Sequence, residues 1–162
     1  MISAVVVTVS DKGFAGERID TSGKEVERLL ADAGFAVSEI IIVPDEESVI
    51  AKTLLMLVDE KKIDLIVTTG GTGVSPRDVT PDATLVVIEK ELPGMAEAMR
   101  FSSLQKTPFA MISRAVVGIR KKSLIINLPG SPKGARENLL VVIPALNHAI
   151  EKIKGDPTDC AS

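Results

Sequence analysis

The sequence predicts an α/β fold, a three-layer sandwich in which helices cover both faces of a mainly parallel sheet. Apolar runs rich in β-branched residues, such as "ISAVVVTV" at 2–9, do not alternate with polar residues, which is typical of strands buried on both faces. These runs alternate with helical patterns, as the right-handed crossovers of a parallel sheet require. Two glycine-rich loops follow two of the runs, at the strand ends where such sheets bind ligands.

Three strands and two helices are predicted in the first 69 residues. Ser22 and Glu25 have the spacing of a capping box at the start of the first helix, and Gly34 ends that helix. The second helix opens with acidic residues and closes with lysines, an order that suits the helix dipole. The predicted strands are 2–9, 35–44 and 63–69, and the predicted helices are 23–34 and 45–62.

The second half of the chain continues the same alternation. A helix is expected to begin with Thr80 as its N-cap and Pro81 in its first turn, and to run to Leu92. Pro144 is expected to break or kink the last helix, because proline lacks the N–H group and crowds the preceding turn. The further strands are predicted at 109–119 and 121–130, and the further helices at 95–105 and 131–155.

The composition favours one globular domain over residues 1–155, followed by a short tail at 156–162. The 162 residues are 45% hydrophobic and 25% charged, and they contain no internal repeat or linker. No apolar run reaches the roughly 18 residues that a membrane span needs, and no basic leader precedes the first strand. We therefore expect a cytoplasmic protein without a membrane partner.

Charge and residue content exclude several classes of function. A net charge of -3, with no Trp or Tyr, argues against a nucleic-acid partner, since neither a general positive field nor a stacking platform is present. The chain has one cysteine, Cys160, and one histidine, His148. It therefore offers no disulfide, no zinc cluster and no Ser-His-Asp triad, and Cys160 is expected to be an unpaired thiol in the tail.

Both glycine-rich loops have a composition that suits phosphate binding. "TTGGTG" at 68–73 and "NLPGSPKG" at 127–134 each lead from a strand into a helix, and their small residues leave backbone N–H groups accessible. Neither loop matches the dinucleotide fingerprint G-x-G-x-x-G or the Walker pattern. The sequence therefore lacks the main motif that would indicate an NAD enzyme or a P-loop NTPase. A tight turn required by the fold is the alternative explanation.

Carboxylates accompany the first of these loops. Asp82 falls in the first turn of the next helix, where it complements the helix dipole, but Asp78 precedes that helix and gains less from it. Asp45, at the end of the second strand, is either a helix cap or a second carboxylate at the same crevice, where adjacent parallel strands would end together. Two carboxylates would repel a phosphate ligand unless a cation such as Mg²⁺ lay between them. Arg77 is assigned to solvent and left out of the site.

Five motifs in order make the chain resemble a known family. They are "TVSD" at 8–11, "VPDE" at 43–46, "TTGGTG…RDVTPDAT" at 68–84, "ISR" at 112–114 and "IINLPGSPKG" at 125–134. Together these motifs resemble the MogA/MoaB family of molybdenum-cofactor biosynthesis proteins, and "RDVTPDAT" favours its MogA-type branch of molybdopterin adenylyltransferases.

This resemblance implies a MogA-like fold that transfers AMP from Mg-ATP to molybdopterin and releases pyrophosphate. It also implies a homotrimer. The apolar Val and Met residues of the later helices are compatible with a trimer or a hexamer. The sequence leaves open whether the chain works alone or passes its product to a molybdenum insertase. The acidic pair of the family, which would be catalytic and hold Mg²⁺, falls on Asp45 and Asp78. The expected substrate-binding residues are Gly70, Gly71, Thr72 and Gly73 at the phosphates, Ser103 and Ser113 at the pterin, and Pro129, Gly130 and Ser131 at the nucleotide.

Other functions remain open at this point. A non-catalytic, MoaB-like scaffold would bind molybdopterin with the same loops but would not need the carboxylate pair. A nucleotide pyrophosphate hydrolase, as in competence-damage-type proteins, would use the same fold without a pterin. A nucleotide-binding oxidoreductase has neither a fingerprint nor a redox residue in this chain.

Overall fold

The mainly parallel sheet that the sequence predicts is confirmed. The computed structural model describes residues 1–158, so Cys160 lies outside the described residues. Strands are found at Ser3–Val9 (β1), Ala36–Val43 (β2), Leu65–Thr69 (β3), Lys90–Glu91 (β4), Val117–Arg120 (β5) and Ser123–Leu128 (β6). Within residues 1–158 they form one six-stranded sheet in the order β2-β1-β3-β6-β5-β4. β2, β1, β3 and β6 are parallel, whereas β5 and β4 are antiparallel to their neighbours.

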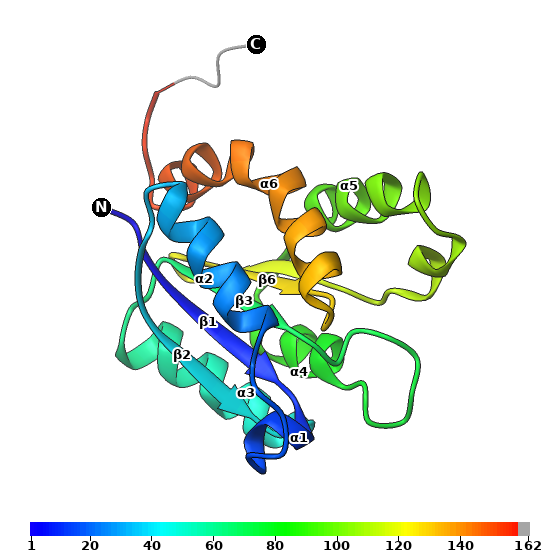
Figure 1. The fold of residues 1–162 in the computed structure, drawn as a ribbon. Coiled ribbons are helices and arrows are strands. Elements are labelled where there is room, and N and C mark those ends of the chain that lie inside the picture. The colour runs from blue at the N-terminus through cyan, green and yellow to red at the C-terminus, as the bar shows by residue number, and fades with distance from the viewer. Residues whose placement is uncertain (159–162) are drawn as a thin grey trace.

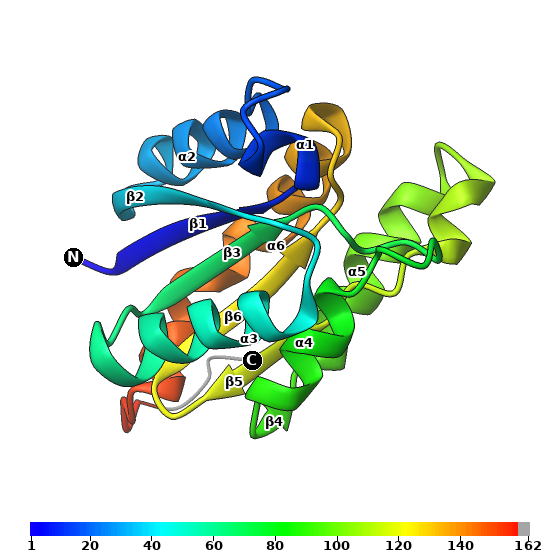
Figure 2. The same cartoon turned by 90° about the horizontal axis from the view of Figure 1, so that it is seen from below.

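Helices cover both faces of this sheet (Figures 1 and 2). They span Asp11–Phe14 (α1), Ser22–Asp32 (α2), Glu47–Leu55 (α3), Thr80–Val87 (α4), Pro93–Leu104 (α5) and Pro132–Ile153 (α6). α2, α5 and α6 pack with Val6, Leu65 and Ile126 in one apolar core. α3 and α4 pack with Val5, Ile66 and Ile125 in a second core on the opposite face. The three-layer sandwich is therefore confirmed, and no helix in residues 1–158 is long and apolar enough to cross a membrane.

The start of α2 is stabilised by a residue that the sequence analysis did not single out. Thr21 is the N-cap but makes no side-chain cap, and Ser22 already lies inside the helix. Asp20 caps the helix instead, since its Oδ1 accepts from the Gly23 N–H at 2.8 Å and its Oδ2 accepts from Thr8 at 2.8 Å. The capping box expected at Ser22 is therefore wrong, because Glu25 pairs with two arginines rather than with the cap.

Two further expectations in the second half are wrong. α4 ends at Val87 rather than at Leu92, because Ile88 turns to an extended conformation and leads into β4. The apolar run expected as a strand from 109 begins as a 3-10 helix at Pro108–Ile112, and β5 starts only at Val117. Thr107 caps that 3-10 helix by accepting from the Phe109 N–H at 3.3 Å, and Pro108 suits its first turn.

α6 is continuous through Pro144, so of the break or kink expected there, the break does not occur. The helix buries Leu139, Val142, Leu146 and Ile150 against the sheet on both sides of the proline. This apolar face holds the helix in place although Pro144 cannot donate the backbone hydrogen bond of its turn.

Candidate active site

Two glycine loops meet at the carboxyl ends of the central strands. The strand ends are level, since Thr8 pairs with Thr69 and Thr69 with Leu128. Gly70 has a φ of 102°, and a Cβ there would lie 2.3 Å from the carbonyl oxygen of Val9. Its N–H donates to the carbonyl of Leu128 at 3.1 Å. The turn explanation is therefore correct for Gly70, whose N–H is already paired.

The next three amides of this loop are different. Among residues 1–158, the N–H groups of Gly71, Thr72 and Gly73 have no hydrogen-bond acceptor. Thr80 fixes the loop from the other side, because its Oγ1 donates to the Gly70 carbonyl at 2.8 Å and its N–H donates to the Gly71 carbonyl at 3.1 Å. Thr80 is thus the first residue of α4 rather than its expected N-cap, which is Val79.

The structure brings the two predicted carboxylates, Asp45 and Asp78, to this loop. Asp45 Oδ1 lies 3.2 Å from the position of a Cβ at Gly71, and Asp78 Oδ2 lies 2.8 Å from that of a Cβ at Gly73. The strands that lead to them, β2 and β3, are not adjacent as expected, since β1 lies between them. The end of β1 supplies the link, because Asp45 Oδ2 accepts from the Asp11 N–H at 2.8 Å and the Asp45 N–H donates to Asp11 Oδ1 at 3.0 Å.

From the sequence, Arg77 is expected to be solvated, but in the structure it is paired. Its guanidinium donates twice to Asp11, at 3.0 and 2.8 Å, and so ties the far end of the loop to the end of β1. The pKa of Asp11 is lowered, chiefly by these hydrogen bonds from Arg77. Asp11 is a residue of the site that sequence reasoning missed, although it belongs to the quoted "TVSD" motif.

Burial and neighbouring charge shift the protonation of Asp45. The pKa of Asp45 is raised, first by burial and then by the negative charges of Asp11 and Asp78, while the hydrogen bond from the Asp11 N–H opposes the rise. Asp45 is therefore close enough to Asp11 and Asp78 to be repelled by both of them. A bound cation would relieve this repulsion, and Oδ1 of both Asp45 and Asp78 accepts no hydrogen bond from residues 1–158.

Two cavities flank the glycine loop and divide the remaining predicted residues between them. The Asp45 cavity, of about 510 Å³, is lined by Asp45, Gly70, Gly71, Gly130 and Ser131, together with residues from the ends of β1 and α2. The Ser113 cavity, of about 320 Å³, is lined by Thr72, Gly73, Ser103, Ser113, Pro129 and Ser131. Ser131 lines both, whereas Asp78 lines neither and approaches the loop at Gly73.

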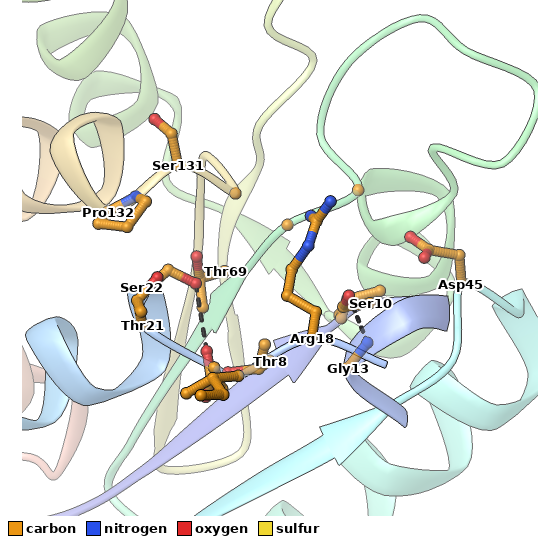
Figure 3. Close-up of a pocket in the computed structure, with 16 residues that line it drawn as sticks. Thr8, Ser10, Gly13, Arg18, Thr21, Ser22, Asp45, Thr69, Ser131 and Pro132 are labelled. Atoms are coloured by element: carbon orange, nitrogen blue, oxygen red, sulfur yellow. Dashed lines mark hydrogen bonds between the residues drawn. The ribbon is translucent and has the colours of Figure 1, made fainter. Parts of the chain in front are cut away.

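Arg18 projects into the Asp45 cavity, with Asp45 on one side and Ser131 and Pro132 on the other (Figure 3). Its guanidinium has no hydrogen bond or ion pair with any of residues 1–158. Sequence reasoning missed Arg18, because nothing in the local pattern distinguishes it from other loop arginines. It gives the cavity a positive charge opposite Asp45.

The predicted serines are held by α5, α6 and the segment before β5. Ser131 caps α6 by accepting from the Gly134 N–H at 3.0 Å. Ser103 donates to Asn138 of α6 at 3.4 Å, and the carbonyl of Ser113 accepts from Arg100 at 3.5 Å. The apolar side chains Phe109 and Ile112 line the same cavity, so the Ser113 cavity combines an apolar wall with hydroxyl groups.

A buried polar network supports the floor of the site. The side chain of Asn127, at the end of β6, donates to Thr68 at 3.0 Å and to Thr84 at 2.9 Å. Its Oδ1 accepts from the Val116 N–H at 3.1 Å. Asn127 is fully buried with all these groups paired, so it fixes β3, α4 and the segment before β5 relative to one another.

The arrangement suits a divalent cation held together with a ligand better than a metal site made of protein alone. No group of three or more His, Cys, Asp or Glu side chains in the described part of the chain could hold a metal ion. Mg²⁺, however, is usually bound by one or two carboxylates plus substrate phosphates. The unpaired oxygens of Asp45 and Asp78 beside three free amides fit that mode.

The fold and the site define an α/β sandwich whose carboxylates and unpaired backbone amides gather at the carboxyl ends of its parallel strands. A family model described as a probable molybdopterin binding domain matches residues 5–148. The chain therefore belongs to the molybdopterin-binding domain family of molybdenum-cofactor biosynthesis proteins.

Named relatives agree with this assignment. The chain is 46% identical to the molybdopterin adenylyltransferase of Helicobacter pylori, with 93% of this chain and 87% of the relative covered. It is 46% identical to the molybdopterin adenylyltransferase of Escherichia coli, with 83% and 70% covered. A crystal structure of the molybdopterin biosynthesis enzyme MoaB from Thermus thermophilus superposes with a TM-score of 0.91 at 49% identity, over 98% of this chain and 100% of that one.

Proposed function

We propose that this protein is a molybdopterin adenylyltransferase, which transfers AMP from ATP to the phosphate of molybdopterin and releases pyrophosphate. The observation that carries the proposal is the convergence of Asp45 and Asp78 on a loop whose amides at Gly71, Thr72 and Gly73 are unpaired. A phosphate chain beside such amides would place the carboxylates within reach of a cation. Relatives named for this reaction, at 46% identity, support the same conclusion.

The two cavities suit the two substrates. We assign ATP to the Asp45 cavity, where Arg18 and the first turn of α6 at Ser131 face the phosphates. We assign the pterin to the Ser113 cavity, whose apolar wall suits a flat ring and whose Ser103 and Ser113 offer hydroxyl groups. The loop from Gly71 to Gly73 lies between the cavities, so the reacting phosphates would meet there.

The transfer needs little covalent chemistry from the protein. A phosphate oxygen of molybdopterin attacks the α-phosphorus of ATP, and the bond to the departing pyrophosphate breaks. Charge then grows on the phosphoryl oxygens, and fixed backbone amides stabilise it without reorganisation. Loss of one such donor costs about 2.7–4 kcal/mol in well-studied oxyanion holes. We assign this role to the amides of Gly71, Thr72 and Gly73.

Asp45 and Asp78 would hold Mg²⁺ with the triphosphate. The ion would neutralise charge on the phosphates and on the leaving pyrophosphate. Asp11 and Arg77 orient Asp45 and the loop, and they need not touch the substrate themselves. The pKa of Asp45 is raised by burial and by neighbouring carboxylates, so protons would compete with Mg²⁺ for this carboxylate at low pH.

Two alternatives predict different products. A non-catalytic scaffold of the MoaB-like kind would bind molybdopterin without consuming ATP, and the names of relatives do not separate the branches, since a structure named MoaB is 49% identical. A nucleotide pyrophosphate hydrolase would cleave ATP at a rate independent of pterin. The carboxylate pair beside free amides favours catalysis, and the second cavity favours a second substrate.

The deciding experiment incubates the purified protein with ATP and Mg²⁺, with and without molybdopterin, and measures pyrophosphate and adenylylated pterin. We expect both products in equal amounts and only when molybdopterin is present. Pyrophosphate formation that ignores the pterin would assign a hydrolase, and binding of pterin without pyrophosphate would assign a scaffold.

We further propose that the protein works as a cytoplasmic homotrimer, with a hexamer as the alternative assembly, and passes its product to a molybdenum insertase. Exposed apolar side chains support an assembly of copies, because several large ones gather on α5 and the 3-10 helix beside it. They are Phe101, Leu104, Phe109, Met111 and Ile112. A product held in a pterin cavity at such a surface would be close to a partner.

A further inference from the structure

The loop that carries Asp78 has few anchors of its own. Between Gly73 and Asp78 the residues are exposed, and Val74, the apolar residue among them, is 63% exposed. Internal bonds join only Ser75 and Asp78, whose N–H groups donate to the Asp78 carboxylate at 3.0 Å and to the Ser75 carbonyl at 2.9 Å. The shape of this loop must therefore be set by contacts from outside it.

Arg114 supplies such outside contacts, in addition to the Arg77–Asp11 pair. Its Nε donates to the Gly73 carbonyl at 2.8 Å, and its Nη2 donates to the Asp78 carbonyl at 2.6 Å. Its own N–H donates to the Thr72 carbonyl at 2.8 Å. Three carbonyls of the loop thus bind one residue that lies about 40 positions later in the chain. In the sequence, Arg114 is the last residue of the "ISR" motif, whose serine is the expected site residue.

Asp82 completes the arrangement around Arg114. In the first turn of α4, its carboxylate accepts two hydrogen bonds from the guanidinium, at 3.2 and 3.0 Å. The pKa of Arg114 is raised, chiefly by the hydrogen bond to Asp82, and the charge of Asp78 adds to the rise. Asp82 therefore aims the guanidinium at the loop, besides complementing the dipole of α4 as the sequence predicts.

We propose that Arg114 is a positioning residue, whose planar fork holds the loop from Thr72 to Asp78 in the shape that adenylyl transfer needs. This inference rests on the proposed function for its kinetic consequence, but its structural content stands on the contacts alone. A guanidinium has five donors in fixed directions, and here they serve two carbonyls and a carboxylate at once. A lysine ammonium could not span these acceptors in the same geometry.

Arg114 also links the Ser113 cavity to Asp78. Ser113, the residue before it, lines the Ser113 cavity, and Thr72 and Gly73, whose carbonyls it binds, line the same cavity. The loop then continues to Asp78, beside the amides that face the phosphates. A pterin that contacts Ser113 would therefore contact the residue next to Arg114, which sets the position of Asp78.

The test compares Arg114→Met with the matched control Arg120→Met. Arg120 makes the same kind of contacts elsewhere, since its fork binds Asp59 twice, at 3.1 and 2.9 Å, and the Val87 carbonyl at 3.1 Å. It lies on β5, away from both cavities. The control therefore removes three side-chain hydrogen bonds, against four at Arg114, without touching the loop.

Two readouts are measured on each variant: the kcat and KM of adenylyl transfer, and the hydrogen exchange of amides in residues 73–79. For Arg114→Met we expect a fall in kcat of about 100-fold, a change in the KM for ATP of less than about threefold, and exchange at least about tenfold faster in the loop. Arg120→Met should keep kcat and loop exchange close to the wild-type values. Equal kcat and equal exchange in the two variants would overturn the inference.

The exchange measurement separates this inference from the proposed function. If the wild-type protein transfers no AMP, the function fails, while faster loop exchange in Arg114→Met alone still supports the positioning role. If the wild-type protein transfers AMP and Arg114→Met behaves like the control, the function stands and the positioning role is wrong.

Arg114→Lys keeps the inference testable if the methionine variant does not fold. It retains the positive charge but not the fork, so we expect kcat to stay at least about tenfold below wild type and the loop amides to exchange faster. Wild-type kcat and exchange in Arg114→Lys would show that charge alone suffices and would contradict the proposed role of the fork.

Discussion

Gly70 and Gly73 stand three residues apart in one loop, but the structure needs glycine at each for a different reason. Gly70 has a left-handed φ, and a Cβ there would meet the Val9 carbonyl at 2.3 Å. Gly73 has no such backbone requirement, and a Cβ there would meet Asp78 Oδ2 at 2.8 Å. One glycine serves the fold, whereas the other makes room for a predicted catalytic carboxylate.

We therefore expect alanine to lower stability at Gly70 but to lower activity at Gly73. Gly70→Ala should lower the free energy of unfolding by more than about 2 kcal/mol, because it strains the backbone and clashes with a strand carbonyl. Gly73→Ala should change the free energy of unfolding by less than about 1 kcal/mol but slow adenylyl transfer about tenfold or more, since it displaces Asp78. Denaturant unfolding and the transfer assay check the pair. A fully active Gly73→Ala would show that the position of Asp78 is unimportant.

The ionised carboxylate of Asp45, the form that would bind Mg²⁺, should lower the stability of the folded protein. Its pKa is raised in the folded protein, so the ionised carboxylate is disfavoured there, and this penalty is present above the folded-state pKa and vanishes as pH falls through it. Asp45→Asn is therefore expected to unfold at a higher temperature than wild type at pH 7 and to lose adenylyl transfer. The gain in Tm should shrink as the pH approaches the ordinary value of 3.8. A variant that is less stable than wild type at pH 7 would contradict this explanation.

Some residues of the candidate site could be predicted from the sequence and others could not. Asp45 and Asp78 could be chosen from the sequence because they follow strand ends that a parallel sheet brings to one edge. Arg114, Arg18 and Asp11 could not, because a charged residue in a loop has many possible partners until the fold brings one within reach. The pairing of Arg77 with Asp11, 66 positions away, is of this kind.

At the scale of the elements, buried strands were the most predictable feature. β1, β3 and β6 are mostly apolar and are buried over nearly their whole length, so their sequence pattern predicts strands buried on both faces. The run that begins at Phe109 is equally apolar but forms a 3-10 helix, in which Phe109, Met111 and Ile112 are exposed. Composition alone cannot tell a buried strand from an exposed apolar turn.

Pro144 gives a prediction that concerns α6 alone. The helix continues through the proline, which removes one backbone hydrogen bond and crowds the preceding turn. Pro144→Ala should therefore raise the free energy of unfolding, by up to about 3 kcal/mol, without changing adenylyl transfer. Denaturant unfolding measures the gain. A loss of stability would mean that the helix is built around the bend that a proline imposes.

For the whole molecule, the exposed apolar side chains of α5 and the neighbouring 3-10 helix predict association. Phe101 is 70% exposed in the single chain and lines neither cavity, so it reports on assembly rather than on binding. Phe101→Glu is expected to shift the protein from the proposed trimer to a monomer, because association would bury the new charge without a partner. Sedimentation analysis measures the mass. A wild-type protein that is monomeric at micromolar concentration would contradict the proposed assembly.

The measurement that tests the central claim most directly follows the α-phosphorus of ATP. Wild-type protein and Asp78→Ala are each incubated with molybdopterin, Mg²⁺ and ATP labelled at that atom, and label in the pterin is counted. The wild-type protein should move the label to molybdopterin, and Asp78→Ala should do so at least about 100-fold more slowly while unfolding at a similar temperature. Equal labelling by the two proteins, or no labelling by the wild type, would contradict the account.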